Sequence, residues 1–288
     1  MKSMIVSLVL LALTLPSFAQ KAKPVDAVIK MVQDRRNADF GQLALTLELP
    51  SILSGDVAST RVHVLRAVDD LGTSLLIEGA DPGFEQNVSA QYGGEESRKR
   101  PTSISVGLVN PSRAASKLTE VRGEVDLFMP AKDPNGVASV AKFRGAGGKP
   151  LAHKALKANG VEITILSDAQ LDAARKKLSE AKRKELAGYG YEGESLEESV
   201  KQYSESLFML SESDFVVSIK DPQKRIHDIS VVTPEGEPKR LMPEEVGDYV
   251  KYSTWGDAIG NDWTLQISMQ TPKNMMRYAF AVKDVELP

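Results

Sequence analysis

Hydrophobic and polar residues alternate along several short stretches of this chain. The clearest stretch runs from Gln42 to Leu49, where leucine occupies every second position and Ala44, Thr46 and Glu48 lie between. A period of two puts alternate side chains on opposite faces of a β-strand, so this stretch predicts a strand with one buried face. The same alternation recurs in residues 104–108, 121–129, 161–165, 215–219, 265–269 and 278–282.

Turn-forming residues separate these stretches. They include Asp81–Gly83, Tyr92–Gly94, Asn110–Ser112 and Asp133–Gly136. Proline sets φ, and glycine or asparagine tolerates a positive φ, so each cluster predicts a turn. Short alternating strands joined by turns, with no helices between them, favour an antiparallel β-sandwich over a parallel α/β domain.

A helical pattern replaces the alternation at Ser167. Ser167 and Gln170 have the spacing of a capping box, and apolar residues then recur at helical intervals until Gly188. A second capping-box spacing begins at Ser195. Two helices joined by a short glycine-rich loop predict an antiparallel helical hairpin. The first helix is rich in basic residues and the second in acidic residues.

One stretch of the chain is echoed later. Residues 61–77 and 225–241 share their hydrophobic pattern at one constant offset, and four residues are identical in both copies: Arg61, His63, Val68 and Gly72 match Arg225, His227, Val232 and Gly236. Recurrence at a fixed offset predicts two related β modules. We therefore expect a mainly β protein with two antiparallel β-sandwich modules, of the immunoglobulin-like kind, and an inserted antiparallel helical hairpin.

The predicted division of the chain follows these patterns. Residues 1–19 form a signal peptide, 20–39 a leader that is a short helix or extended, 40–166 the first module, 167–210 the helical hairpin and 211–288 the second module. The signal peptide is indicated by Lys2, the apolar run Met4–Leu15 and the small residues at Ser17 and Ala19. The apolar run is shorter than the roughly 20 residues that span a bilayer, so we expect a periplasmic or secreted protein.

Three motifs resemble those of a group of uncharacterised exported bacterial proteins. They are an A-V-D-D-x-G hairpin at Ala67–Leu75, an N-P-S-R-x-A turn within Val109–Leu118, and an L-x-x-V-x-G strand ending at Val121–Val125. The resemblance covers about residues 40 to 140 and, more loosely, the C-terminal echo. It implies β-sandwich domains and no activity.

Composition and motifs exclude several kinds of chemistry. The chain has 36 basic and 39 acidic residues, which gives no indication of nucleic acid or an anionic membrane as partner. It has no cysteine, hence no thiol nucleophile and no disulfide, so its core alone must stabilise it. Gly188–Gly193 fits G-x-G-x-x-G but follows a helix, whereas a dinucleotide site needs a preceding strand. We expect no cofactor.

Histidines and paired aspartates are the remaining polar candidates. His63 and His227 occupy matching strand positions and would meet if the modules packed about a pseudo-twofold axis, yet no further residues complete a metal-ligand set. Asp69 and Asp70 are expected to form a turn through their own backbone, with an ion pair to Arg113 as an alternative. They could also serve as paired carboxylates or as calcium ligands.

The loop that carries both tryptophans is the predicted ligand-binding site. Trp255 lies close to three polar residues, Asp257, Asn261 and Asp262, and loops on rigid sandwiches often bind ligands through such groups. Trp263 shares the parity of the following strand and is expected in the core. We therefore predict a non-catalytic binding or structural protein of the bacterial envelope, with a protein or glycan as partner.

Two alternatives remain open from the residues alone. One is an envelope hydrolase that uses Asp69, Asp70, Asp257 or Asp262 as paired carboxylates, which requires two of them in one cleft. The other is a calcium-dependent adhesion module.

Overall fold

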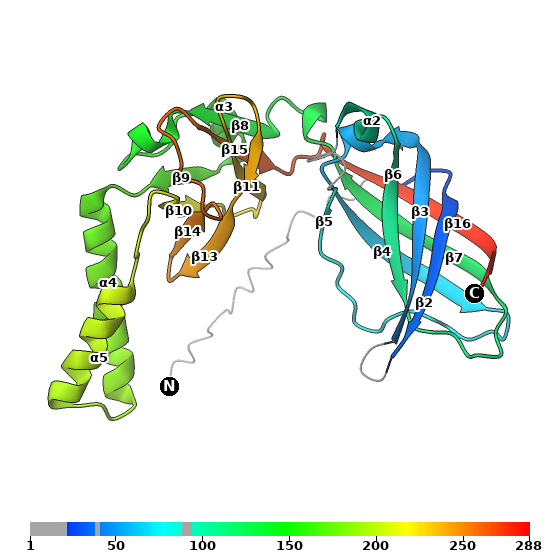
Figure 1. Ribbon diagram of the computed structural model, residues 1–288, viewed down its shortest axis with the longest axis horizontal. Helices are drawn as coiled ribbons and strands as arrows, with labels where there is room; N and C mark the ends of the chain where they lie inside the picture. The colour runs from blue at the N-terminus through cyan, green and yellow to red at the C-terminus, as the bar shows by residue number, and fades with distance from the viewer. Residues whose placement is uncertain (1–21, 38–40, 88–93) are drawn as a thin grey trace, which may run out of the picture.

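The computed structural model describes residues 22–37, 41–87 and 94–288 (Figure 1). Within these residues the protein is mainly β, with several antiparallel sheets and four α-helices. The four sheets form two groups, which we call the first unit and the second unit (Figure 1). The predicted signal peptide, residues 1–19, lies outside the described residues, as do two residues of the predicted turn at 92–94.

The first unit has two sheets that face one buried cluster. One sheet has the strand order β1 (Lys23–Pro24), β16 (Met275–Glu286), β7 (Lys117–Phe128), β4 (Ser59–Asp69) and β5 (Glu85–Gln86); the other has β2 (Val28–Arg36), β3 (Gly41–Leu53) and β6 (Pro101–Leu108). The alternation predicted for Gln42–Leu49 is confirmed, because all four leucines are fully buried. They pack with residues of the other sheet such as Val125 and Leu127. A short helix, α2 (Glu95–Arg98), precedes β6.

The second unit repeats this arrangement. One sheet has the order β12 (Pro238–Arg240), β11 (Ile226–Val232), β15 (Thr264–Met269) and β8 (Val137–Ala141); the other has β13 (Met242–Val246), β14 (Tyr249–Ser253), β10 (Asp214–Lys220) and β9 (Glu162–Ile165). Its core contains residues of both sheets, among them Ile163, Val217, Leu265 and Ile267. Helix α3 (Lys154–Asn159) contributes Leu156 to this core.

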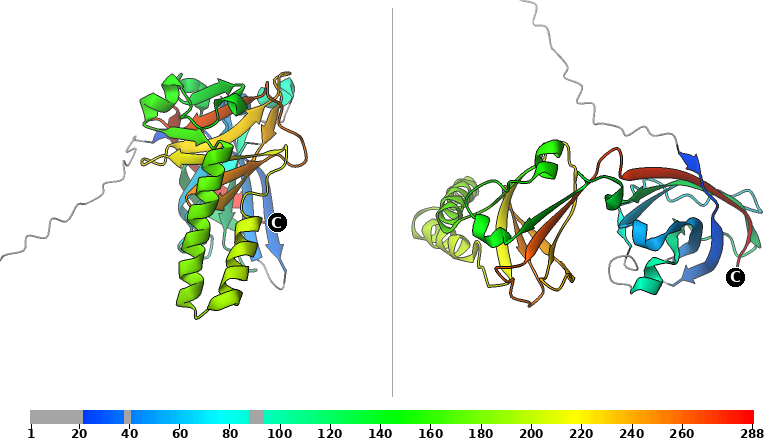
Figure 2. Two further views of the ribbon diagram at one scale, coloured as in Figure 1. Left: turned by 90° about the vertical axis from the view of Figure 1, so that its left-hand side faces the viewer. Right: turned by 90° about the horizontal axis from the view of Figure 1, so that it is seen from above.

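Two helices project from the second unit. Helix α4 (Asp168–Gly188) and helix α5 (Gly193–Ser206) lie side by side (Figure 2), and Arg183 of α4 pairs with Glu197 of α5 at 2.5 Å. The backbone N–H of Ser167 donates to Gln170 Oε1 at 3.1 Å, as the predicted capping box requires. Leucines and Ala174 at the base of α4 pack against the outer face of β10 and β14, which fixes the pair to the unit.

The sequence echo corresponds to equal backbone geometry in the two units. In the first unit the N–H of Asp69 donates to the carbonyl oxygen of Thr73, and the N–H of Gly72 donates to that of Asp69. The second unit has the same two backbone hydrogen bonds, from the N–H of Thr233 to Glu237 O and from the N–H of Gly236 to Thr233 O. Gly72 and Gly236 have φ of 82° and 88°, which explains why glycine occurs in both copies. The sheet orders also correspond, since β16, β7 and β4 match β8, β15 and β11.

Three strands pair in a different unit from the one that the sequence predicts. β8, expected in the first module, pairs with β15, and β16, expected in the second module, pairs with β7 over Met275–Glu286. β9, also expected in the first module, pairs with β10. The predicted divisions at 166 and 211 therefore do not match the strand pairing. Alternation identifies the buried face of a strand but not its partner, because pairing is decided by contacts distant in sequence.

The chain passes between the two units twice, near residues 129–133 and near residues 271–274, and these two segments are joined by hydrogen bonds. Met129 N–H donates to Asn274 O at 2.8 Å, and Thr271 Oγ1 donates to Asp133 Oδ2 at 2.7 Å. All four residues are buried. These hydrogen bonds join the units where the chain passes between them. In the predicted leader, residues 28–36 are extended rather than helical and pair with β3.

Candidate functional site: the cavity between the two units

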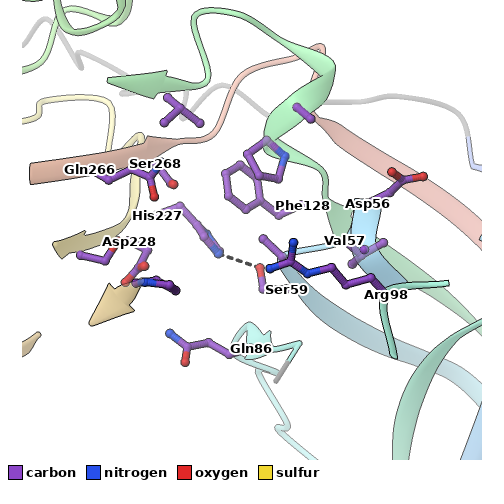
Figure 3. A pocket seen from close by; sticks show the side chains of 17 residues that line it. Asp56, Val57, Ser59, Gln86, Arg98, Phe128, His227, Asp228, Gln266 and Ser268 are labelled. Carbon is purple, nitrogen blue, oxygen red and sulfur yellow. Dashed lines mark hydrogen bonds between the residues drawn. The ribbon is translucent and has the colours of Figure 1, made fainter. Parts of the chain in front are cut away.

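A cavity of about 270 Å³ lies where the units meet (Figure 3). It is formed by the ends of β4 and β7 on one side and by β11 and β15 on the other, so neither unit forms it alone. Apolar side chains, among them Val57, Phe128 and Val137, make up most of its surface, and the polar side chains that line the rest are Asp56, Ser59, Gln86, Arg98, His227, Asp228, Ser230, Gln266 and Ser268. We call it the junction cavity.

His227 lies between the units and connects them. Its Nε2 is 2.6 Å from Ser59 Oγ, and its Nδ1 is 3.1 Å from Gln270 Nε2. A carboxamide nitrogen can only donate, so Nδ1 accepts, and Nε2 carries the proton and donates to Ser59. Burial, with the positive charge of Arg61, lowers the pKa of His227 to about 4. The imidazole is therefore neutral near pH 7 and joins two strands by hydrogen bonds.

Aromatic rings of the first unit enclose this imidazole. The Phe128 ring centroid lies 4.2 Å from that of His227, and the Phe84 ring meets it edge-on at 4.9 Å. The guanidinium of Arg61 lies 4.4 Å from the Phe84 centroid. Such cation–π and edge contacts are each worth about 1 kcal/mol, so they hold the units together and shape the cavity wall.

Asp126 holds the guanidinium group of Arg61 in place. It is 3% exposed and accepts from Arg61 at 2.8 Å and from Arg277 at 2.6 Å, while His63 Nε2 lies 3.3 Å away. Burial alone would raise the pKa of Asp126, but the hydrogen bonds from Arg277 and Arg61 outweigh it and the pKa is lowered. Asp126 is therefore a carboxylate at neutral pH, and it fixes Arg61 against Phe84.

The cavity offers several kinds of hydrogen-bonding group. Hydroxyls come from Ser230 and Ser268, carboxamides from Gln86 and Gln266, and burial raises the pKa of the Asp228 carboxyl. Because these groups come from both units and stand beside aromatic rings, the cavity can hold a small polar molecule through several hydrogen bonds and ring contacts.

The predicted tryptophan loop lies elsewhere. Trp255 is 87% exposed, and Trp263 is half-buried against the core of the second unit. Asp257 pairs with Lys239 at 3.2 Å, and Asn261 and Asp262 are exposed. None of the four predicted binding residues (Trp255, Asp257, Asn261, Asp262) lines the junction cavity.

The paired aspartates serve separate loops. Asp69 Oδ1 accepts from the N–H groups of Leu71 and Thr73, which is the turn arrangement. Asp70 accepts from the N–H and hydroxyl of Ser116, so the contact that braces the two loops is made by Ser116. The structure shows no ion pair from either aspartate to Arg113, which instead lines a hollow beside Asp34.

The four aspartates considered for a hydrolase or a calcium site do not lie together in one cleft. Asp69 and Asp70 belong to a turn of the first unit and Asp257 and Asp262 to a loop of the second, and the junction cavity contains none of them. Across residues 22–37, 41–87 and 94–288, no three His, Asp or Glu side chains are grouped so as to hold a metal ion.

Sequence reasoning missed most of the cavity. It identified His227 as a matching strand position, but not Ser59, Phe128 or Gln266. These residues lie on strands whose alternation indicates only that they face outward, and the structure places those outward faces against the other unit. The echo of His63 and His227 was the one pattern that pointed here.

Comparison with protein-family models, curated proteins and solved structures gives no match to this chain. In the described part of the chain, no helix has the length and apolar character needed to cross a bilayer.

Proposed function

We propose that this chain is a non-catalytic binding protein of the bacterial envelope, periplasmic or secreted, whose two units hold a small polar ligand in the junction cavity. Each unit is, in this proposal, an antiparallel β-sandwich of the immunoglobulin-like kind, and α4 with α5 is an antiparallel hairpin. Export rests on the signal-peptide pattern of residues 1–19. The resemblance to exported bacterial proteins supports the same address.

The observation that carries the proposal is the composition of the cavity. A space of about 270 Å³ with hydroxyls, carboxamides and aromatic rings around it suits a ligand the size of one or two sugar rings. Its polar groups come from strands, which hold them in fixed positions. A glycan is therefore the favoured ligand among the partners expected in the envelope.

A contact in the same cavity favours a second candidate, an ester hydrolase. Ser59 Oγ and His227 Nε2 are 2.6 Å apart, which is the distance between a nucleophile and its base. Two observations oppose it. His227 donates to Ser59, because Nδ1 accepts from Gln270, and a pKa of about 4 makes the imidazole a weak base at neutral pH. We therefore favour binding without catalysis.

Calorimetric titration with short envelope glycan fragments tests the binding function. We expect Gln266→Ala to weaken binding by about tenfold, because a lost hydrogen bond in a cavity costs roughly 1 to 1.5 kcal/mol. Trp255→Ala is the matched control, since that exposed side chain does not line the cavity, and it should bind like the unchanged protein.

Three results would contradict this proposal. Loss of binding in Trp255→Ala with normal binding in Gln266→Ala would move the site to the tryptophan loop. Covalent labelling of Ser59 by a fluorophosphonate probe would favour the hydrolase. Absence of any glycan binding would leave the cavity as a structural joint.

A further inference from the structure

The first unit has an open strand position that the second unit fills. In the second unit, β13 pairs antiparallel with β14 over Met242–Val246. The echoed strands are β4 in the first unit and β11 in the second. β3 precedes β4 and pairs with β6, and β10 precedes β11 and pairs with β14, so β14 of the second unit corresponds to β6 of the first. Among the described residues, no strand pairs with β6 on its side away from β3. The place that β13 occupies is thus not filled by a strand beside β6, and only at its end does the N–H of Val109, just after β6, donate to Leu75 O at 2.9 Å.

The free edge of β6 lacks the features that normally prevent strand addition. Proline occurs only at its first residue, Pro101, and the strand carries no charged side chain. Its pairing with β3 is continuous from Thr102 to Leu108, with no bulge in between. Natural edge strands are usually protected by charges, prolines or bulges. An unprotected edge of this length can accept another strand.

A cavity of about 390 Å³ adjoins this edge. It lies between β6, the edge of β4 and the loop of residues 76–85. Val62, Val64 and Leu76 line it and are only half-buried, although they pack on the core of the unit. Leu65 and Ile77 on its rim are 55% and 43% exposed. Apolar side chains of an added strand would bury this surface, which is favourable by about 25 cal/mol per Å².

The loop beside the cavity is acidic. Glu78, Asp81 and Glu85 are exposed, and the loop of residues 76–85 contains no lysine or arginine. Within the described chain, none of the three carboxylates forms a salt bridge. Carboxylates that form no salt bridge favour a partner with basic residues, because complementary charge raises the rate and specificity of association.

We propose that the first unit binds an extended polypeptide segment of alternating apolar and basic residues, which adds to β6 as an antiparallel strand. Its apolar side chains enter the cavity against Val62 and Val64, and its basic side chains lie near the carboxylates of the 76–85 loop. A segment as long as β13, five residues, spans roughly 17 Å at the usual rise of a strand. This site is separate from the junction cavity.

Hydrogen exchange of the full mature protein with a synthetic peptide tests the proposal. The probe is a short peptide in which lysine and valine alternate. We expect it to slow amide exchange in Thr102–Leu108 and to leave β13 unchanged. A matched peptide with proline in place of the central valine should give no protection, because proline removes a backbone donor and cannot continue the ladder.

Charge variants test the chemistry of the partner. Changing Glu78, Asp81 and Glu85 together to lysine should weaken binding of the lysine–valine peptide by roughly tenfold, at up to about 1 kcal/mol for each exposed pair. The control changes three exposed glutamates at the start of α5, Glu192, Glu194 and Glu198, to lysine. It makes the same change in net charge and should leave the affinity unaltered.

Disulfide trapping locates the peptide, because the natural chain has no cysteine. A lysine–valine peptide that ends in cysteine should crosslink to Ile77→Cys, at the cavity rim, and not to Leu71→Cys, which is 56% exposed but outside the cavity. Equal trapping at both positions, or equal binding of the proline peptide, would overturn the proposal. Protection of β6 by a fatty acid but not by peptide, or by self-association alone, would also overturn it.

Discussion

At the scale of single residues, Asp126 shows how one buried group can organise many contacts. It is nearly inaccessible, yet it accepts from two guanidinium groups and lies beside His63. Removing its charge should leave Arg61 without its carboxylate partner in a partly buried setting, and Arg277 with only Glu124, 3.6 Å away. We expect Asp126→Asn to lower the free energy of unfolding by roughly 2 to 3 kcal/mol, measured by denaturant titration at pH 7.

A control and a pH series make this prediction specific. Glu120→Gln removes a salt bridge on the same strand, but its partner Arg66 is half exposed, so the loss should be under about 1 kcal/mol. The folded pKa of Asp126 is lowered, so its stabilisation is present above the unfolded pKa of about 4 and is lost as pH falls through the folded value. A difference between native protein and Asp126→Asn that persists undiminished at pH 2 would contradict this account.

At the scale of elements, strands β4, β7 and β16 meet at Gly123. Gly123 is paired with Phe280 on β16, and a Cβ at this position would lie 2.5 Å from His63 O and 2.8 Å from the Phe280 ring. The glycine therefore allows the ring to cover the strand. We expect Gly123→Ala to lower the melting temperature and to destabilise the protein by about 1 to 3 kcal/mol through overpacking.

Gly145 provides the comparison. A Cβ there meets nothing within 4 Å, so Gly145→Ala should change stability by no more than about 0.5 kcal/mol. If both substitutions had the same small effect, the close packing of Phe280 on β7 would not be a source of stability.

At the scale of the whole molecule, His227 makes the junction sensitive to pH. Its folded pKa is about 4, below the unfolded value of about 6.5, so between these values the unfolded chain binds the extra proton. The stability it supports is present above pH 6.5 and declines as pH falls toward 4, by about 2 to 3 kcal/mol in total. Denaturant titrations from pH 7.5 to 4 should show this decline in the native protein.

His227→Gln removes the titrating group and retains an amide that can donate to Ser59. Between pH 7.5 and pH 4, the free energy of unfolding of His227→Gln should therefore fall by about 2 to 3 kcal/mol less than that of the native protein. Parallel curves for the two proteins would show that His227 is not the group that couples the junction to pH.

Much of the fold could be predicted from short-range pattern. The leucines of Gln42–Leu49, the helix start at Ser167 and the glycine turns at Gly72 and Gly236 all follow from local geometry, because periodicity and φ requirements act over a few residues. The candidate site could not be predicted in this way. Ser59, Phe128 and Gln266 are unremarkable strand residues until two distant segments bring them together.

The sequence by itself determined the mainly β character, the buried faces of the alternating strands, the start of α4 after Ser167 and the repeated turn, since each depends on neighbours in the chain. Only the tertiary structure decided that β8, β9 and β16 pair in a different unit from the one predicted, that the two outward faces enclose the junction cavity, and that no strand covers the outer edge of β6 in the described chain. The physical reason is that strand partners are selected by hydrogen bonding and packing between segments far apart in sequence, and a period-two pattern carries no information about which segments meet.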